Sequence, residues 1–155
     1  MPARHIYGDG KAVRVKTTAS TMTNVGDLLG LVTGASQPAQ LFPWTTDLVT
    51  TQAAFHGAFV GGAADASAIN VDSDILAYTA GIHQYPCAAL GSAANIGTFV
   101  GPAKAAGNNL DAQTVAVVAD AAHAIGRTVE HAVVGQTYLK FEMVGTVTFG
   151  GPQVP

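Results

Sequence analysis

Short apolar runs separated by glycine and asparagine fill residues 95–129, and this stretch constrains the fold most strongly. The runs occupy residues 98–100, 114–118 and 124–129. The glycines and the Asn108-Asn109 pair between them favour tight turns over a continuing helix. We therefore expect a mainly β protein, folded as a small β-barrel or β-sandwich domain. The stretch contains no recognisable catalytic arrangement.

A seven-residue pattern occurs twice, as NVGDLLG at residues 24–30 and as NIGTFVG at residues 95–101. Each copy places Asn, a β-branched aliphatic residue and Gly ahead of apolar positions. This order predicts a glycine-containing turn followed by a short buried strand. A nucleotide-binding interpretation of these glycines is disfavoured, because neither copy opens a convincing helix after a strand.

The composition indicates a single domain that covers much of its surface with partners. The chain has 155 residues, enough for one domain with a proper core. Apolar residues make up 48% and charged residues 11%, whereas soluble domains usually carry roughly 25% charge. The formal net charge of -3 argues against a protein whose work is to neutralise nucleic-acid phosphates, so we expect no nucleic-acid partner.

The single cysteine and the N-terminal sequence bear on where the protein works. Cys87 cannot form an intrachain disulfide, which fits a reducing compartment. Residues 1–11 lack the apolar run of a signal peptide, and no stretch reaches the roughly 20 apolar residues of a membrane helix. We expect neither secretion by that route nor a membrane partner.

Positive charge is concentrated at the N-terminus. Four basic residues lie there, and no further Lys or Arg follows until Lys104. Residues 1–11 show neither the helical nor the strand periodicity of apolar residues. We expect them to form an arm that becomes ordered only when it binds a partner. Residues 12–16 alternate as a half-solvated strand, with Val13 and Val15 on one side. We expect residues 1–16 to form the arm and first strand, and residues 17–155 one β-rich domain with an extended C-terminal tail.

The segment after the first strands contains the best helix candidate. Within residues 45–55, Leu48, Thr51 and Phe55 continue a helical spacing from Trp44, and Asp47 could cap the first turn. Just before it, two prolines place Phe42 and Trp44 on a loop or edge. These two aromatics either cap the end of the barrel or form an apolar interface anchor.

Three later stretches complete the expected fold. Residues 58–60 form a short strand after the helix, and residues 75–87 form a hairpin that turns near Ala80-Gly81. Residues 139–149 form the clearest strand of this part, because apolar and polar side chains alternate along it. Gly145 occupies a position on the same side of the strand as the apolar residues, and it marks a bulge or crowding point.

The residues capable of catalysis or metal binding do not form a recognisable site. The five histidines lack the clustered spacing of a structural zinc site, and His83 and His123 are interpreted as structural. Cys87 has no neighbouring cation that would lower its pKa and is interpreted as a small buried hydrophobe. Asp72 and Asp74 fit a solvated loop better than an acid-base pair. We expect no catalytic residue, no metal and no cofactor.

The succession of segments in the last two-thirds of the chain resembles tailed-bacteriophage capsid decoration proteins, also called cement proteins. The resemblance rests on segment order and glycine placement in QAAFHGAFVGGAADAS, ILAYTAGIHQYPC, IGTFVGPAKAAG, TVAVVADAAHAIGRTV and YLKFEMVGTVTFG. It implies a small β-rich protein on the outer surface of an assembled virion head, usually a homotrimer and sometimes a dimer. Its partner would be the major capsid protein, whose neighbouring copies it bridges to stabilise the shell. The family has no catalytic residues or cofactor to transfer.

The basic arm supplies the expected contacts with the capsid. Residues 1–16 could order on the shell by adding a strand to an exposed edge, with basic side chains facing shell carboxylates. The contact candidates are Arg4, His5, Tyr7, Lys11, Arg14 and Lys16. Phe42 and Trp44 are candidates for the subunit or capsid interface.

Two other classes of protein remain open at this point. A host- or carbohydrate-binding β-module would use exposed aromatics such as Trp44, Tyr78 and Tyr85. A small hydrolase on a β-barrel would need a concave site near His83, Cys87 and Asp72. Decoration of a capsid is favoured over both.

Overall fold

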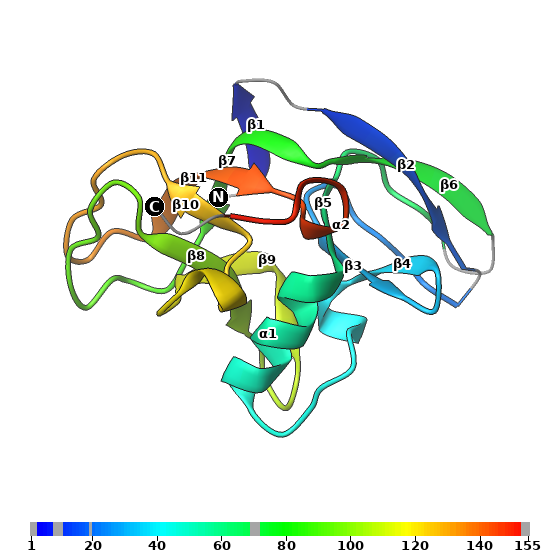
Figure 1. Cartoon of the computed structure of the whole chain (residues 1–155), viewed down its shortest axis with the longest axis horizontal. Helices are drawn as coiled ribbons and strands as arrows, with labels where there is room; N and C mark the ends of the chain where they lie inside the picture. The colour runs from blue at the N-terminus through cyan, green and yellow to red at the C-terminus, as the bar shows by residue number, and fades with distance from the viewer. Residues whose placement is uncertain (1–2, 8–10, 19, 69–71, 153–155) are drawn as a thin grey trace.

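The computed structural model describes residues 3–7, 11–18, 20–68 and 72–152, and these form two antiparallel sheets (Figure 1). The six-stranded sheet runs, in spatial order, β1 (Arg4–Tyr7), β7 (Ala80–Pro86), β11 (Tyr138–Val144), β10 (Gly126–Thr128), β8 (Phe99–Lys104) and β9 (Leu110–Val117). The five-stranded sheet runs β2 (Ala12–Thr17), β6 (Ser73–Tyr78), β5 (Phe59–Ala63), β3 (Leu28–Val32) and β4 (Ala35–Pro38). Both sheets have free edges, so the mainly β prediction is confirmed as a sandwich-like domain and the barrel alternative is wrong.

The N-terminal strands run beside strands from the middle of the chain, along the upper side of Figure 1. β1 pairs with β7 in one sheet, and β2 pairs with β6 in the other. The alternation expected for residues 12–16 is confirmed, because Val15 is buried while Arg14 and Lys16 are exposed. The predicted arm is corrected for Arg4–Tyr7, because this segment is a strand of the protein's own sheet.

The chain changes sheets at Thr79, which corrects the hairpin expected at residues 75–87. β6 and β7 flank this residue but belong to different sheets, so they do not pair. The backbone N–H and the hydroxyl of Thr79 donate to the Lys11 carbonyl at 2.7 and 3.0 Å, and its carbonyl accepts from Gly145 N–H at 2.8 Å. Lys11 lies just before β2 and Gly145 just after β11. Their bonds with Thr79 keep the backbone extended as it passes from one sheet to the other, where the sequence suggested a turn.

Helix α1 (Leu48–Ala58) covers the core and confirms the predicted helix with shifted ends. It begins after Asp47, whose side chain accepts a hydrogen bond from Thr50 N–H at 2.8 Å. Thr51 and Phe55 are buried on its inner face, as their spacing predicted. The short strand expected after the helix is confirmed as β5.

The last strand is shorter than its alternation suggested. Leu139, Phe141 and Met143 of β11 are fully buried, which confirms the prediction that these alternate side chains share one apolar face of the strand. The strand ends at Val144, and a second short helix, α2 (Thr146–Phe149), begins after Gly145. A Cβ atom at Gly145 would lie 2.4 Å from the Val60 carbonyl oxygen, so the crowding predicted there is confirmed. The prediction of strand for residues 146–149, and of only one helix, is wrong.

The end of the predicted C-terminal tail, residues 153–155, lies outside the described residues. Within the part of the chain that the structure describes, the helices are too short to cross a membrane as apolar spans. Short 3-10 turns, η1 (Ala39–Leu41) and η2 (Ala121–His123), complete the fold.

Candidate functional site

The basic residues of the N-terminal segment lie on the outside of the two edge strands. Arg4 is exposed on β1, and Arg14 and Lys16 are exposed on β2. Lys11, just before β2, is also exposed, while its carbonyl holds Thr79. The backbone of Tyr7 belongs to β1, and its side chain lies outside the described structure. Four of the six contact candidates therefore reach the surface.

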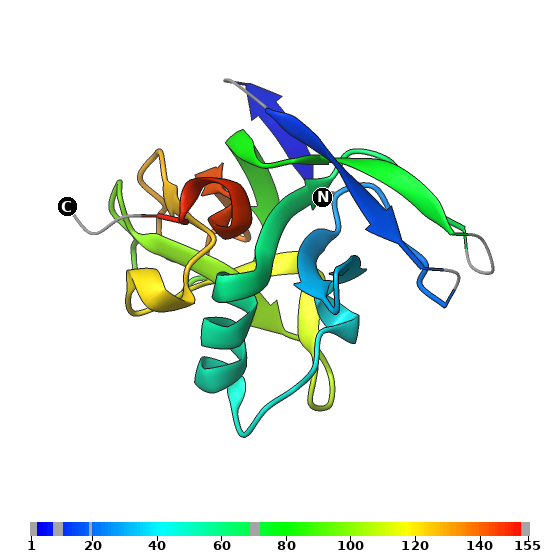
Figure 2. The ribbon, with the colours of Figure 1, turned by 45° about the vertical axis from the view of Figure 1, so that its right-hand side comes forward.

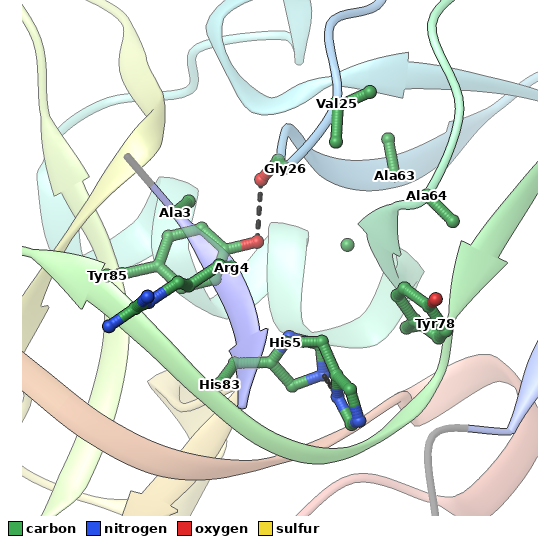
Figure 3. A pocket seen from close by; sticks show the side chains of 11 residues that line it. Ala3, Arg4, His5, Val25, Gly26, Ala63, Ala64, Tyr78, His83 and Tyr85 are labelled. Carbon is green, nitrogen blue, oxygen red and sulfur yellow. Dashed lines mark hydrogen bonds between the residues drawn. The ribbon is translucent and has the colours of Figure 1, made fainter. Parts of the chain in front are cut away.

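His5 is the exception, because its ring turns into a pocket between the two sheets (Figure 3). The pocket encloses about 250 Å³ beside Gly26, Gly62 and Ala63. His5 stacks on Tyr78 of β6 with ring centroids 5.0 Å apart, and its Nδ1 lies 3.5 Å from His83 Nε2 of β7. His5 thus links β1 to both sheets. Its half-buried ring is not a free capsid contact.

His83 is held in its neutral form by its surroundings. Its Nε2–H donates to the Ala80 carbonyl at 3.1 Å, and only 2% of the residue is exposed. The pKa of His83 is lowered to about 4: burial is the largest cause, the bond to Ala80 opposes the shift, and the charge of His5 adds to it. This neighbourhood confirms the interpretation of His83 as a structural histidine. The pairing with His5 could not be read from spacing, because the two residues lie 78 positions apart.

Tyr85 forms the inner wall of the same pocket. Its hydroxyl donates to the Gly26 carbonyl at 2.6 Å, and the residue is 1% exposed. Burial, followed by the negative charge of Asp27, raises the pKa of Tyr85 far above its ordinary value. The hydroxyl therefore serves as a buried donor that joins β7 to the turn before β3.

Replacing Tyr85 with phenylalanine is expected to lower the free energy of unfolding by about 1–2 kcal/mol, because the Gly26 carbonyl loses its buried donor. Urea unfolding followed by circular dichroism measures the change, and Tyr138→Phe at a half-buried position is the control. Equal stability of Tyr85→Phe and the wild type would show that this bond contributes nothing.

The two aromatics of the loop before α1 lie in different surroundings. Phe42 is 9% exposed and meets Phe55 edge-on, with ring centroids 5.1 Å apart. Phe42 therefore belongs to the core. Of the two roles expected for it, this burial favours a cap on the end of the domain, and the prediction of Phe42 as an interface anchor is corrected. Trp44 is half-buried against the same core, and Lys104 Nζ lies 5.8 Å from its ring centroid. Trp44 keeps part of its ring accessible.

The residues considered for catalysis do not converge. Cys87 is buried, and burial raises the pKa of its thiol, so it is a poor nucleophile at neutral pH. Asp72 and Asp74 lie beside Lys16 in an open depression, apart from His83 and Cys87. Among the described residues, no three His, Cys, Asp or Glu side chains are placed to hold a metal ion.

The repeated seven-residue pattern forms equivalent turns, as predicted. Gly26 and Gly97 adopt φ of +89° and +87°, and the fourth turn residue donates its N–H to the carbonyl of Asn24 or Asn95. This is the geometry of a type II turn, which requires a positive φ at its third residue. Each turn leads into a strand, β3 or β8.

Residues 133–136 form a third turn of this kind, which the sequence reasoning missed. Gly135 adopts φ of +83°, and Gln136 N–H donates to the Val133 carbonyl at 3.1 Å. The available signal was a β-branched residue followed by glycine, Val134-Gly135, shortly before β11. The absence of Asn at the first position concealed it.

Two of these turns belong to a pair of loops, residues 88–98 and 130–137, which we call the paired loops. Ala94 and Ala132 exchange two backbone hydrogen bonds of 2.8 and 2.9 Å. Leu90 N–H donates to the Gln136 carbonyl at 3.1 Å, and its own carbonyl accepts from Gly135 N–H at 2.8 Å. The paired loops form the end of the six-stranded sheet on the left of Figure 1. They position the second residue of each turn outward.

Apolar side chains are unusually accessible on the paired loops. Ile96 is 70% exposed, Val134 is 64% exposed and Val133 is 55% exposed. Val117 at the end of β9 is also exposed, and a groove of about 300 Å³ lies between it and residues 90–95. Residues 84–103 contain no Asp, Glu, Lys or Arg, and Glu130 of the other loop is paired with Lys140 at 3.2 Å. This end of the molecule is therefore largely apolar, and its charges are the Glu130–Lys140 pair and Arg127, whose Nε–H donates to the Gly97 carbonyl at 3.2 Å.

Comparisons of the chain with protein-family models, with curated proteins and with solved structures give no significant match.

Proposed function

We propose that this protein is a capsid decoration protein, which binds the outside of an assembled phage head and bridges neighbouring copies of the major capsid protein. The observation that carries the proposal is the apolar surface of the paired loops, on which Ile96, Val133 and Val134 are exposed. The segment order that resembles cement proteins supports it independently. The site requires no catalytic group, because the work of such a protein is binding.

The surface of the paired loops has the composition of a protein interface. The centre of an interface is depleted in charged residues and contains apolar side chains that water would otherwise surround. Contiguous exposed apolar surface on a soluble protein marks such contacts. Ile96, Val133 and Val134 are presented on turn tips, where they can enter depressions in a partner.

The basic edge of the molecule supplies a second contact with the shell. Arg4, Arg14 and Lys16 lie on β1 and β2, the edge strands on one side of the two sheets. Complementary charges of this kind steer association more than they add affinity. Because β1 is part of the sheet, the basic residues act from a fixed strand, and no ordering of Arg4–Tyr7 on the shell is required.

Oligomerisation would multiply these contacts. Homo-oligomers with closed symmetry match the local symmetry axes of an icosahedral shell, and we favour a trimer over a dimer. Each subunit adds a contact with the same shell, so modest contacts combine through effective concentration. Binding to the assembled shell and not to separate capsid subunits stabilises the shell by mass action.

The double variant Ile96→Asp with Val134→Asp tests the proposal. It places two charges on the paired loops, so binding to purified heads of the encoding phage should fall about tenfold or more. Co-sedimentation of protein with heads measures the binding. Thermal unfolding should change little, because both side chains are exposed.

Val25→Asp is the matched control. Val25 occupies the same position in the equivalent turn before β3 and is 59% exposed, but it lies outside the paired loops. Undiminished binding of the double variant, or an equal loss in the control, would contradict the role of the paired loops.

The carbohydrate-binding alternative finds less support in the side chains. Tyr85 is buried, Tyr78 is stacked on His5, and Trp44 packs partly against the core. A sugar platform needs accessible aromatic faces, so decoration is the function that we propose.

A further inference from the structure

Strand β1 is the least securely attached strand of the six-stranded sheet. It has four residues, lies at the edge and, among the strands that the structure describes, pairs with β7 alone. The register with β7 shifts between His5 and Tyr7, so its backbone ladder is irregular. Short edge strands open more easily than central strands, because few contacts hold them. The side-chain contacts of His5 therefore add to the attachment, together with Ala3 just before the strand, which is buried in the core.

The two histidines of the pocket bind each other only when the facing nitrogens share one proton. His83 Nε2–H donates to the Ala80 carbonyl, so the nitrogen of His5 that faces it at 3.5 Å must accept. A proton on His5 Nδ1 would place two N–H groups against each other. A proton on both rings would place two positive charges with ring centroids 4.8 Å apart in a mostly buried pocket.

Strand β1 also controls how well His83 is shielded from water. His5 lies directly opposite His83 across the β1–β7 pair, and Phe141 lies opposite it on β11. Tyr78 and Tyr85 rings lie on further sides (Figure 3). Phe141 and Tyr85 are buried and Tyr78 is half-buried, so departure of β1 opens a route by which water reaches His83.

From this geometry we propose that the His5–His83 pair is an acid-sensitive latch: protonation of the pair releases β1 from β7 and exposes β7 as a new edge of the six-stranded sheet. The released state binds the proton that the closed state excludes, so acidification favours release. Nothing in this step depends on capsid binding. The exposed β7 edge offers unpaired backbone groups to which a strand of a partner can add.

The other titratable groups near the pair do not neutralise it from the pocket side. Asp27, before β3, is engaged by Asn24 N–H at 2.8 Å and Gln113 Nε2 at 2.5 Å, and burial raises the pKa of Asp27. Glu142 lies on the face of β11 opposite to that of Phe141 and is exposed. The remaining charged or titratable groups on adjoining elements are Lys140 on the outer face, the cationic Arg4, which also borders the pocket, and Tyr78 and Tyr85 around the pocket.

The direction and size of the pH effect follow from His83. Burial lowers the pKa of His83 from 6.5 to about 4 in the closed state, so closure is lost as the pH falls from 6.5 towards 4. The opening equilibrium of β1 should rise roughly 70-fold between pH 7.5 and pH 4.5 by this linkage.

Amide hydrogen exchange of the full chain at pH 7.5 and pH 4.5 tests the latch, after correction for the intrinsic pH dependence of exchange. In the wild type, the β1 amides and the β7 amides bonded to β1 should lose protection by roughly 70-fold, while the β8 and β9 amides keep theirs. In His83→Gln, whose amide can still donate to Ala80, the change should fall below about threefold. His131→Gln, at an exposed histidine, should behave as the wild type.

Three results would overturn the proposal. They are full protection of β1 at pH 4.5, an equal loss in His83→Gln, or a loss shared by β8 and β9 that indicates global unfolding. If His83→Gln does not fold, a nuclear magnetic resonance titration of His83 in the wild-type protein decides. A pKa well below 6.5, with β1 resonances shifting in the same transition, supports the latch, whereas a pKa of 6.5 or above contradicts it.

Discussion

Replacing Phe55 with alanine is expected to lower the free energy of unfolding by about 4 kcal/mol. Phe55 is fully buried on the inner face of α1, where it contacts Phe42 and Phe59 with ring centroids 5.1 and 5.6 Å away. Gly30 of β3 packs so closely that a Cβ atom there would lie 2.9 Å from the Phe55 ring. Truncation therefore leaves a cavity between the helix and the five-stranded sheet that neither element can fill.

Urea unfolding followed by circular dichroism measures this loss, with Val49→Ala as the control. Val49 lies on the same helix and is 56% exposed, so its truncation should change stability by less than about 0.5 kcal/mol. A loss below about 1 kcal/mol for Phe55→Ala would show that α1 does not pack on the core as described.

Replacing Gly126 with alanine is expected to cost about 3 kcal/mol, or roughly 10 °C in Tm. Gly126 belongs to β10, which lies between β8 and β11 in the middle of the six-stranded sheet. A Cβ atom would lie 2.2 Å from the Glu142 carbonyl oxygen and 2.6 Å from the Phe141 ring. The carbonyl belongs to a paired backbone and cannot rotate away, so β10 and β11 must separate.

Gly91→Ala is the matched control for Gly126→Ala. An added Cβ at Gly91 meets nothing within 4 Å, so the variant should unfold with the wild type. Calorimetry on both variants separates a local clash from a general effect of losing glycine. A Tm for Gly126→Ala within a few degrees of the wild type would contradict the described pairing of β10 with β11.

The sequence predicted correctly those helices, strands and turns whose structure is decided by residues close together in the chain. Alternation identified the inward side chains of β11, and a capping Asp47 with the spacing of Thr51 and Phe55 identified α1. The repeated Asn and Gly residues identified two turns before buried strands. In each case the residues that define the pattern are neighbours in the sequence, so the signal is complete within a short window.

Contacts between distant segments decided the elements that were missed. An Ala-Gly pair after an apolar run resembles a hairpin turn, but bonds from Thr79 to Lys11 and Gly145 make it a crossing between sheets. The end of β11 depends on the carbonyl of Val60, which excludes any side chain at Gly145.

The same distinction applies to the candidate sites. The absence of charge in residues 84–103 could be read from the sequence, but the pairing of residues 88–98 with residues 130–137 could not. His5 was predicted as a surface contact because its neighbours are basic. Only the pairing of β1 with β7 brings its ring to His83 and turns it into the pocket.

Electron cryo-microscopy of phage heads assembled with and without this protein tests the proposed function most directly. The proposal predicts additional density on the outer shell surface over three-fold or quasi-three-fold positions, with the paired loops and the β1–β2 edge facing the capsid protein. Heads that are indistinguishable with and without the protein, or density inside the shell or on the tail alone, would contradict it.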